Sequence, residues 1–319
     1  MFNRRRTALL ALPVAVTATL AGCAGGTGTA DSGDGRLQVL TSFYPLQYVA
    51  EQVGGDLVEV SSLTPPGAEP HDLELSPRQV RELGEAGVVV VLGGFQPSVD
   101  EAVEARAPQH LVDAAATEAV AAHMAEAHAE EGEDEEHADE GGDGHDHAGQ
   151  DPHFWLDPTL LAAVATDVAT ALSDADPENA DAYATRLATL TDELTALDQE
   201  YVDGLADCER SVIVTSHEAF GFLTERYGLA QVGISGLDPE AEPSPARLRE
   251  IRDVVDENGV TTIFTEVLVS PDVAETLADD LGITTAVLDP LESLAESTTD
   301  YREGMRTNLE TLRAALGCA

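Results

Sequence analysis

Residues 88–94 read VVVVLGG, a continuous apolar run that ends in two glycines. Strands of parallel sheets covered by helices have this composition, because both of their faces are buried. Similar runs occur along the chain, at LQVLTS (37–42), LVEVSSL (57–63), SVIVTSH (211–217), TTIFTE (261–266) and TTAVLDP (284–290). Stretches with a helical pattern separate them. This alternation predicts an α/β protein built on parallel sheets.

A long helix is predicted between the two groups of strands. Asp176 followed by Pro177 is typical of a helix start. Apolar residues then recur at alternating spacings of four and three, which places them on one helix face: Tyr183, Leu187, Leu190, Leu194, Leu197 and Tyr201. We expect this helix, at 176–206, to join an N-terminal α/β lobe (36–175) rigidly to a C-terminal α/β lobe (207–319). A surface helix of a single domain is the alternative.

The N-terminus predicts export. Arginines at positions 4–6 precede an apolar run too short to span a bilayer comfortably, so residues 1–22 indicate a signal peptide. LAGC (20–23) resembles the lipobox of bacterial lipoproteins, which implies a lipid on the sulfur of Cys23; an incidental cysteine is the alternative. The glycine-rich residues that follow make 23–35 a lipid anchor and flexible tether. We therefore expect an extracytoplasmic protein, anchored to the outer face of the cell membrane.

The charge balance restricts the possible partners. The chain has 60 acidic residues against 16 arginines and no lysine, a formal net charge of -44. Such a surface repels phosphate backbones, which excludes nucleic acid, and it attracts cations. Outside the anchor, the remaining cysteines are Cys208 and Cys318. In an oxidising compartment this pair predicts a disulfide, and two buried free thiols are the alternative.

An acidic, histidine-rich loop is predicted at 119–150, within the N-terminal lobe. Residues 126–146 contain eleven acidic residues and no basic one, a composition that cannot bury enough apolar surface to fold. Such a run is usually only a solvated surface. Here histidines accompany it, which favours a weak, exchangeable metal-binding loop: His123, His128, His137, His145 and His147.

Three other histidines lie where an α/β fold places ligands. His71 and His153 each follow a proline in a loop, and His217 ends an apolar strand. Ligands of open α/β sheets bind beyond the carboxyl ends of the strands, where Asp289 also terminates a strand. Three imidazoles and a carboxylate suit zinc, although each histidine taken singly could be structural. His110 has no such companions and is interpreted as a structural or surface residue.

These motifs resemble those of a known family, the zinc- and manganese-binding lipoproteins of bacterial ABC importers (cluster A-I metal solute-binding proteins). The resemblance covers nearly the whole mature chain. It rests on FYPL (43–46), PGAEPHDLELSP (66–77), DPHFWLDP (151–158), VTSHEAFGFLTERYGL (214–229), SGLDPEAEPSPARL (235–248) and VLDPL (287–291). It implies two α/β lobes, a rigid connecting helix and a metal in the cleft between the lobes. The implied ligands are His71, His153, His217 and Asp289.

His217 indicates which metal is preferred. Manganese- and iron-type members resemble TSE where this chain has TSH, and imidazole suits zinc better than manganese. Some zinc-type members have a glutamate immediately before the first histidine. Here Pro70 takes that position and Glu69 lies one residue further back, which leaves the fourth ligand open between Asp289 and water. Glu266 has a weaker claim, as a residue that orients a ligand or lies at the surface.

The sequence therefore predicts a monomeric zinc receptor that delivers Zn²⁺, its transported ligand, to an ABC transporter permease and performs no chemistry on it. A manganese- or iron-type receptor and a metal-binding adhesin or buffer are the alternatives, and copper is a competing metal. A zinc hydrolase would need an open coordination position and a general base. Glu218 follows His217, but the sequence contains no HExxH or GxSxG motif.

Overall fold

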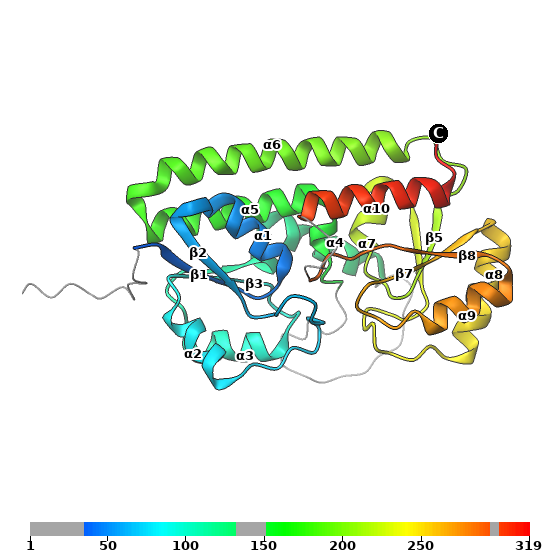
Figure 1. The fold of residues 1–319 in the computed structure, drawn as a ribbon, viewed down its shortest axis with the longest axis horizontal. Coiled ribbons are helices and arrows are strands. Elements are labelled where there is room, and N and C mark those ends of the chain that lie inside the picture. The colour runs from blue at the N-terminus through cyan, green and yellow to red at the C-terminus, as the bar shows by residue number, and fades with distance from the viewer. Residues whose placement is uncertain (1–34, 132–150, 294–299) are drawn as a thin grey trace, which may run out of the picture.

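The computed structural model describes residues 35–131, 151–293 and 300–319 (Figure 1). The predicted signal peptide, Cys23, all of the tether but its last residue, and the part of the acidic loop that carries His137, His145 and His147 lie outside the described residues. Among the helices within the described ranges, none is both long and apolar enough to cross a membrane.

Two four-stranded parallel sheets form the centres of two lobes. The N-terminal sheet has the order β2-β1-β3-β4, and the C-terminal sheet has the equivalent order β6-β5-β7-β8. The strands are β1 (Leu37–Thr41), β2 (Val58–Ser62), β3 (Val88–Val91), β4 (Leu111–Asp113), β5 (Val212–Thr215), β6 (Ala230–Gly233), β7 (Thr262–Thr265) and β8 (Thr284–Val287). This confirms the predicted α/β fold with two parallel-sheet lobes.

Helices cover both faces of each sheet. The N-terminal lobe contains α1 (Tyr44–Gly54), α2 (Pro77–Glu85), α3 (Pro97–Arg106), α4 (Glu118–Glu131) and α5 (Pro158–Ala175). The C-terminal lobe contains α7 (Gly221–Tyr227), α8 (Pro245–Asn258), α9 (Asp272–Leu281) and α10 (Tyr301–Leu316). Helices α2 and α3 lie on the opposite side of the N-terminal sheet from α1 and α5 (Figure 1).

The valine run at β3 is explained by these layers. Val88 and Val90 join the core on the α1 and α5 side, whereas Val89 and Val91 join the core under α2 and α3. Successive side chains of a strand point to opposite faces, so a strand buried on both faces needs an unbroken apolar run. The core on the α1 and α5 side continues into the C-terminal lobe, where it includes Phe264 of β7.

The connecting helix, α6 (Ala180–Leu205), runs along both lobes with α10 beneath it (Figure 1). It packs against α1 and α5 of the N-terminal lobe and against α7 and α10 of the C-terminal lobe. Its predicted apolar face is buried, apart from Leu187, which is half-buried. The helix begins later than predicted, because residues 177–179 form a 3₁₀ turn and the Asp176 carboxylate accepts hydrogen bonds from the side chains of Asn179 and Tyr183.

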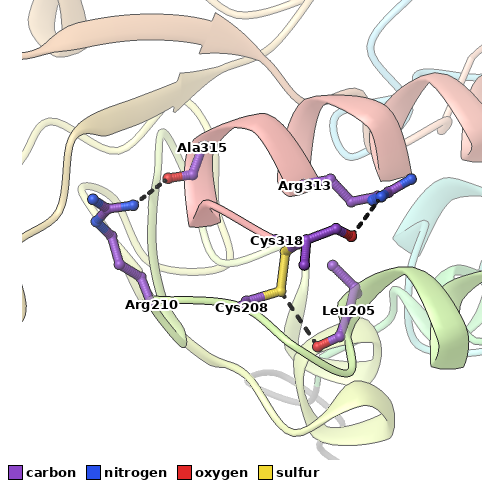
Figure 2. The surroundings of a disulfide bond; sticks show 7 residues. Leu205, Cys208, Arg210, Arg313, Ala315 and Cys318 are labelled. Carbon is purple, nitrogen blue, oxygen red and sulfur yellow. Dashed lines mark hydrogen bonds between the residues drawn. A yellow bond between two sulfur atoms is a disulfide. The ribbon is translucent and has the colours of Figure 1, made fainter.

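A disulfide joins Cys208 to Cys318 beyond the C-terminal ends of α6 and α10 (Figure 2). Cys208 follows α6, and Cys318 follows α10. The side chain of Arg313 also donates to the main-chain oxygen of Ala319 at 2.9 Å. The disulfide therefore fixes the end of the connecting helix to the last helix of the C-terminal lobe.

Candidate metal site

Strand ends of the C-terminal sheet deliver two of the site's side chains. His217 lies two residues beyond β5, and Glu266 follows β7 directly. In this sheet β6 lies on one side of β5, and β7 lies on the other. The switch point of the sheet therefore lies between β5 and β7. Open α/β sheets form their binding crevices at this place.

The remaining side chains come from three loops of both lobes. His71 lies between β2 and α2, and His153 precedes a 3₁₀ turn at Phe154–Leu156 that leads into α5. Glu292 lies after β8 in the C-terminal lobe. The structure thus brings the three histidines together at the boundary between the lobes, with Glu292 among them.

The ligand atoms of His71, His153, His217 and Glu292 all lie within 4.8 Å of one another. Oε1 of Glu292 is 2.9 Å from Nε2 of His153, 3.5 Å from Nε2 of His71 and 3.7 Å from Nε2 of His217. The Nε2 atoms of His153 and His217 are 3.4 Å apart. Tetrahedral zinc with bonds near 2.05 Å would separate its ligand atoms by roughly 3.3 Å. The observed spacings therefore fit one tetrahedral zinc ion.

Carboxylates fix the orientation of the two buried imidazoles. Asp151 Oδ1 lies 2.7 Å from Nδ1 of His153, and Glu266 Oε2 lies 2.7 Å from Nδ1 of His217. An imidazole that donates its Nδ1–H to a carboxylate presents Nε2 to a metal in a fixed direction and becomes a stronger ligand. His153 and His217 are therefore pre-oriented for coordination through Nε2.

The site holds protons tightly when no cation is bound. Burial lowers the pKa of His217, but hydrogen bonds to Glu266 and Glu292 outweigh it and raise the pKa to about 10. Burial also lowers the pKa of His153, but its interactions with Asp151 and Glu292 outweigh burial, so the pKa is raised. Burial raises the pKa of Glu292, but hydrogen bonds from the histidines hold it well below its usual range. A divalent cation must displace the imidazole protons, and it then meets a carboxylate that is already ionised.

His71 is the most accessible of the three histidines. Its side chain is 17% exposed, against 0% for His153 and 1% for His217. Its ring packs edge-on against Phe95, with ring centroids 4.7 Å apart. Its main-chain N–H donates to Oε1 of Glu69, and that oxygen stays 3.9 Å from the Nε2 of His71. Glu69 therefore shapes the loop of His71 and lies outside the group of four.

A pocket of about 370 Å³ lies mainly in the C-terminal lobe, with Glu69 of the N-terminal lobe in its lining. Its lining includes Glu69, Ser216 next to His217, and two further carboxylates, Glu240 and Glu242. Burial raises the pKa of Glu69, although hydrogen bonds from the main-chain N–H groups of His71 and Asp72 oppose this rise. The pocket thus gathers three carboxylates near the loops that carry His71 and His217.

Asp289 does not belong to the group, and Glu292 takes its place. Oδ1 of Asp289 accepts a hydrogen bond from the main-chain N–H of Leu291 at 2.9 Å, and Asn308 of α10 bonds both main-chain groups of Asp289. This aspartate therefore shapes the turn after β8. Burial, with the nearby charges of Glu292 and Glu266, raises its pKa to about 6.

The turn aims Glu292 at the histidines. Leu291 has a φ of 57° and is buried, a conformation that costs a leucine about 1–2 kcal/mol. Such strain persists only where the surrounding structure imposes it, commonly at functional sites. The Asp-Pro pair at 289–290 is a typical turn former, so the sequence carried a signal that the aspartate serves the backbone.

Of the histidines predicted for the acidic loop, His123 is the one whose side chain the structure describes, and it lies outside the group of four. Nε2 of His123 lies 3.0 Å from the carboxylate of Glu225, and its ring stacks on Phe222, so it connects α4 with α7 of the other lobe. His128 lies in α4, and its side chain is outside the described part of the structure. His110 precedes β4, where its carbonyl accepts a hydrogen bond from Val89.

Comparison with known proteins agrees with this arrangement. A family model for ZnuA, described as "Zinc-uptake complex component A periplasmic", matches residues 39–315. The chain belongs to the ZnuA family. This confirms the resemblance to zinc-type solute-binding proteins that the sequence motifs indicated.

Relatives within the ZnuA family share about a third of their residues with this chain. The "High-affinity zinc uptake system protein ZnuA" of Bacillus subtilis is 33% identical over 294 residues, which cover 91% of this chain and 90% of the relative. The "Zinc-binding lipoprotein AdcA" of Streptococcus pneumoniae serotype 4 is 36% identical over 291 residues. That match covers 88% of this chain but 56% of AdcA, so the chain spans little more than half of that relative.

Solved structures show the same fold. The Zn(II)-bound ZnuA-like domain of S. pneumoniae AdcA has a TM-score of 0.70 and 30% identity, with 88% of this chain and 99% of that chain covered. The laminin-binding protein Lmb of Streptococcus agalactiae, described as bifunctional "with adhesin and metal transporting activity", has a TM-score of 0.73, 30% identity and the same coverage. The names of these ZnuA-like proteins describe binding and transport rather than catalysis.

Proposed function

We propose that this protein is an extracytoplasmic zinc receptor that binds one Zn²⁺ tightly between its lobes and delivers it to an ABC transporter permease. The proposed ligands are Nε2 of His71, His153 and His217 and the carboxylate of Glu292. Zinc is the cargo of this site, so the protein must be able to release the ion as well as bind it. Membership of the ZnuA family and the zinc-binding names of the relatives support the proposal.

The observation that carries the proposal is the spacing of the four ligand atoms. Four of the six separations range from 2.9 to 3.7 Å and bracket the value for a tetrahedral zinc site, and all six lie within 4.8 Å. Three of the four ligands are nitrogens, and imidazole ligands suit zinc, whereas carboxylate and water oxygens suit manganese. The three imidazoles, His217 among them, therefore favour zinc over manganese.

A closed set of four protein ligands also distinguishes a receptor from a hydrolase. Catalytic zinc sites keep an open position for water beside three protein ligands. Here Glu292 fills the fourth position, and Glu218 is engaged with Arg247 at 3.0 Å. The zinc-loaded protein should show no activity towards ester and peptide substrates.

Metal analysis of the purified protein tests the proposal directly. Protein purified without added metal should contain zinc, and metal-free protein should bind one equivalent in competition with a chelator of known affinity. Preferential binding of manganese would contradict a zinc receptor. If deletion of the gene left growth normal in zinc-depleted medium, a buffer or adhesin without a transport role would be favoured.

The remaining parts of the proposal concern location and assembly. The lipobox-like segment supports a lipid anchor at Cys23, which would hold a monomer beside the permease at the outer face of the membrane. Mass spectrometry of the membrane-extracted protein would detect the lipid, and Cys23→Ala should release the protein into the medium.

Adhesion is a second candidate function. It is favoured by the likeness to Lmb and to the laminin-binding protein Lbp of Streptococcus pyogenes, a structure with a TM-score of 0.71 and 30% identity. Saturable binding of the zinc-loaded protein to immobilised laminin would support it, and equal binding to albumin would contradict it.

A further inference from the structure

Two loops from different lobes meet beside the group of four. The first runs from β2 to α2 and carries His71, and the second runs on from β8 and carries Glu292. Apart from the contact of these two side chains, a hydrogen bond joins the loops: the main-chain N–H of Gly67 donates to Oγ of Ser293 at 2.8 Å. Ser293 is 5% exposed, whereas Gly67 is exposed, so this bond is partly buried.

The geometry of the first loop presents the Gly67 N–H for this bond. Residues 65–68 form a β-turn, closed by the N–H of Ala68 on the carbonyl of Pro65 at 3.1 Å. Gly67 has a φ of 75°, which a turn with proline second and glycine third requires. Gly67 lies four residues before His71, so the position of the turn and that of the imidazole are linked by a short piece of chain.

The second loop is held from the N-terminal lobe on its other side as well. Nε1 of Trp155 donates to the carbonyl of Pro290 at 2.7 Å, and Trp155 lies two residues after His153. The carboxylate of Glu292 therefore sits between two contacts that cross the lobe boundary, one at Pro290 and one at Ser293. The strained Leu291 lies between these contacts.

We propose that Ser293 is a positioning residue that latches the Glu292 loop to the His71 loop and thereby slows the release of zinc. This proposal rests on the proposed zinc site and deepens it. Ser293 touches no metal in this role. It keeps the carboxylate and the most exposed imidazole at coordinating distance, so that zinc can leave only after both the latch and the metal bonds open.

The consequence is kinetic. Opening of the lobes must break the Gly67–Ser293 bond, whereas entry of zinc into an already open site need not. Loss of one neutral hydrogen bond should therefore raise the dissociation rate by roughly threefold to tenfold and leave the association rate nearly unchanged. A partner that separates the loops would have the same effect, which fits a receptor that must hand on its cargo.

The test compares zinc dissociation from wild-type protein and the variants Ser293→Ala and Ser293→Thr. Zinc-loaded protein is mixed with an excess of a colorimetric chelator, and release is followed by its absorbance. The fluorescence of Trp155, the single tryptophan, gives a second signal because its ring lies 5.1 Å from that of His153. Ser293→Ala should release zinc roughly threefold to tenfold faster, and Ser293→Thr, which keeps a hydroxyl, should recover part of the wild-type rate.

Ser235→Ala is the matched control. Ser235 is also buried in the C-terminal lobe, but its hydroxyl donates to the carbonyl of Ala241 in the same lobe, at 2.7 Å. This variant loses a comparable bond without affecting the contact between the loops, so its dissociation rate should match the wild type.

The outcomes separate the latch from the proposed function. An unchanged dissociation rate in Ser293→Ala, with one zinc still bound, would overturn the latch and leave the receptor intact. A purely structural Ser293 would lower the melting temperature of the metal-free variant without changing that rate, which would also overturn it. A wild-type protein that binds no zinc tightly would instead remove the proposed function itself.

Discussion

Oε1 of Glu292 lies 2.9 Å from Nε2 of His153, although 139 residues separate them and they belong to different lobes. Both side chains are almost completely buried. Burial of a charged pair is costly unless each partner is fully satisfied, and here the same carboxylate also approaches His71 and His217. The two lobes are thus joined by an arrangement that makes physical sense as a cation site.

Replacement of Glu292 should weaken zinc binding far more than replacement of Asp289. Glu292→Gln removes an anionic ligand, and we expect the zinc affinity to fall on the order of 100-fold. Asp289→Asn keeps a carbonyl oxygen that can accept from the N–H of Leu291, so the turn and the affinity should change little. Chelator competition measures both. The reverse order of effects would return the fourth ligand position to Asp289.

The fold was largely predictable because it depends on local patterns. The valine run at 88–91 needs both faces buried, and the spacing of Tyr183, Leu190 and Leu197 defines one helix face whatever lies opposite. The start of α6 was less predictable, because the Asp176 carboxylate could either cap a helix or accept hydrogen bonds from side chains. It bonds Tyr183 and Asn179, and the regular helix begins only at Ala180.

The site was only partly predictable. His217 lies two residues beyond β5, so its place at the sheet edge follows from topology. Glu292 depends on the left-handed conformation of Leu291, and sequence patterns seldom indicate a positive φ at a leucine. His123 looked like part of the acidic loop, but its pairing with Glu225 depends on how the two lobes sit together.

His217 should determine the choice between zinc and manganese. His217→Ala removes one of three imidazoles and should lower the zinc affinity on the order of 100-fold. His217→Glu retains four possible ligands but makes the site richer in oxygen, so its preference should shift towards manganese. Competition titrations of zinc against manganese measure both effects.

The control for these variants is His110→Ala, because His110 lies beside β4, outside the group of four. It should alter neither affinity nor selectivity. If His217→Ala bound zinc as tightly as the wild type, the proposed ligand set would be wrong.

The disulfide should stabilise the fold without setting the zinc affinity. Cys208 and Cys318 are 110 residues apart in sequence, and closure of a loop of this length restricts the unfolded chain strongly. The double variant Cys208→Ser, Cys318→Ser should lose roughly 2–5 kcal/mol of stability. Urea unfolding with and without a reductant measures this. Zinc affinity should stay near wild type, because the disulfide lies beyond the ends of α6 and α10, and a large loss of affinity would instead link the disulfide to the positions of the lobes.

Zinc binding should release protons even at pH values well above the usual pKa of histidine. The pKa of His217 is raised from its ordinary 6.5 to about 10, so without zinc its imidazolium persists through neutral pH, paired with Glu266 and Glu292. In the metal-free protein this pairing stabilises the fold fully below pH 6.5 or so, and the contribution disappears as pH rises through about 10. Zinc needs the neutral imidazole, so its affinity should increase with pH across the same window, by up to about tenfold per pH unit for each proton displaced.

Calorimetry at pH 8 in two buffers of different ionisation enthalpy counts the protons, and the wild type should release at least one per zinc. Glu266→Gln removes a carboxylate that raises the pKa of His217, so this variant should release fewer protons and show a shallower pH dependence. Glu218→Gln, which changes a carboxylate next to His217 that pairs with Arg247 instead, should behave as the wild type. Equal binding heats in both buffers for the wild type would mean that His217 is already neutral before zinc arrives, and that its pairing with Glu266 and Glu292 does not hold a proton in solution.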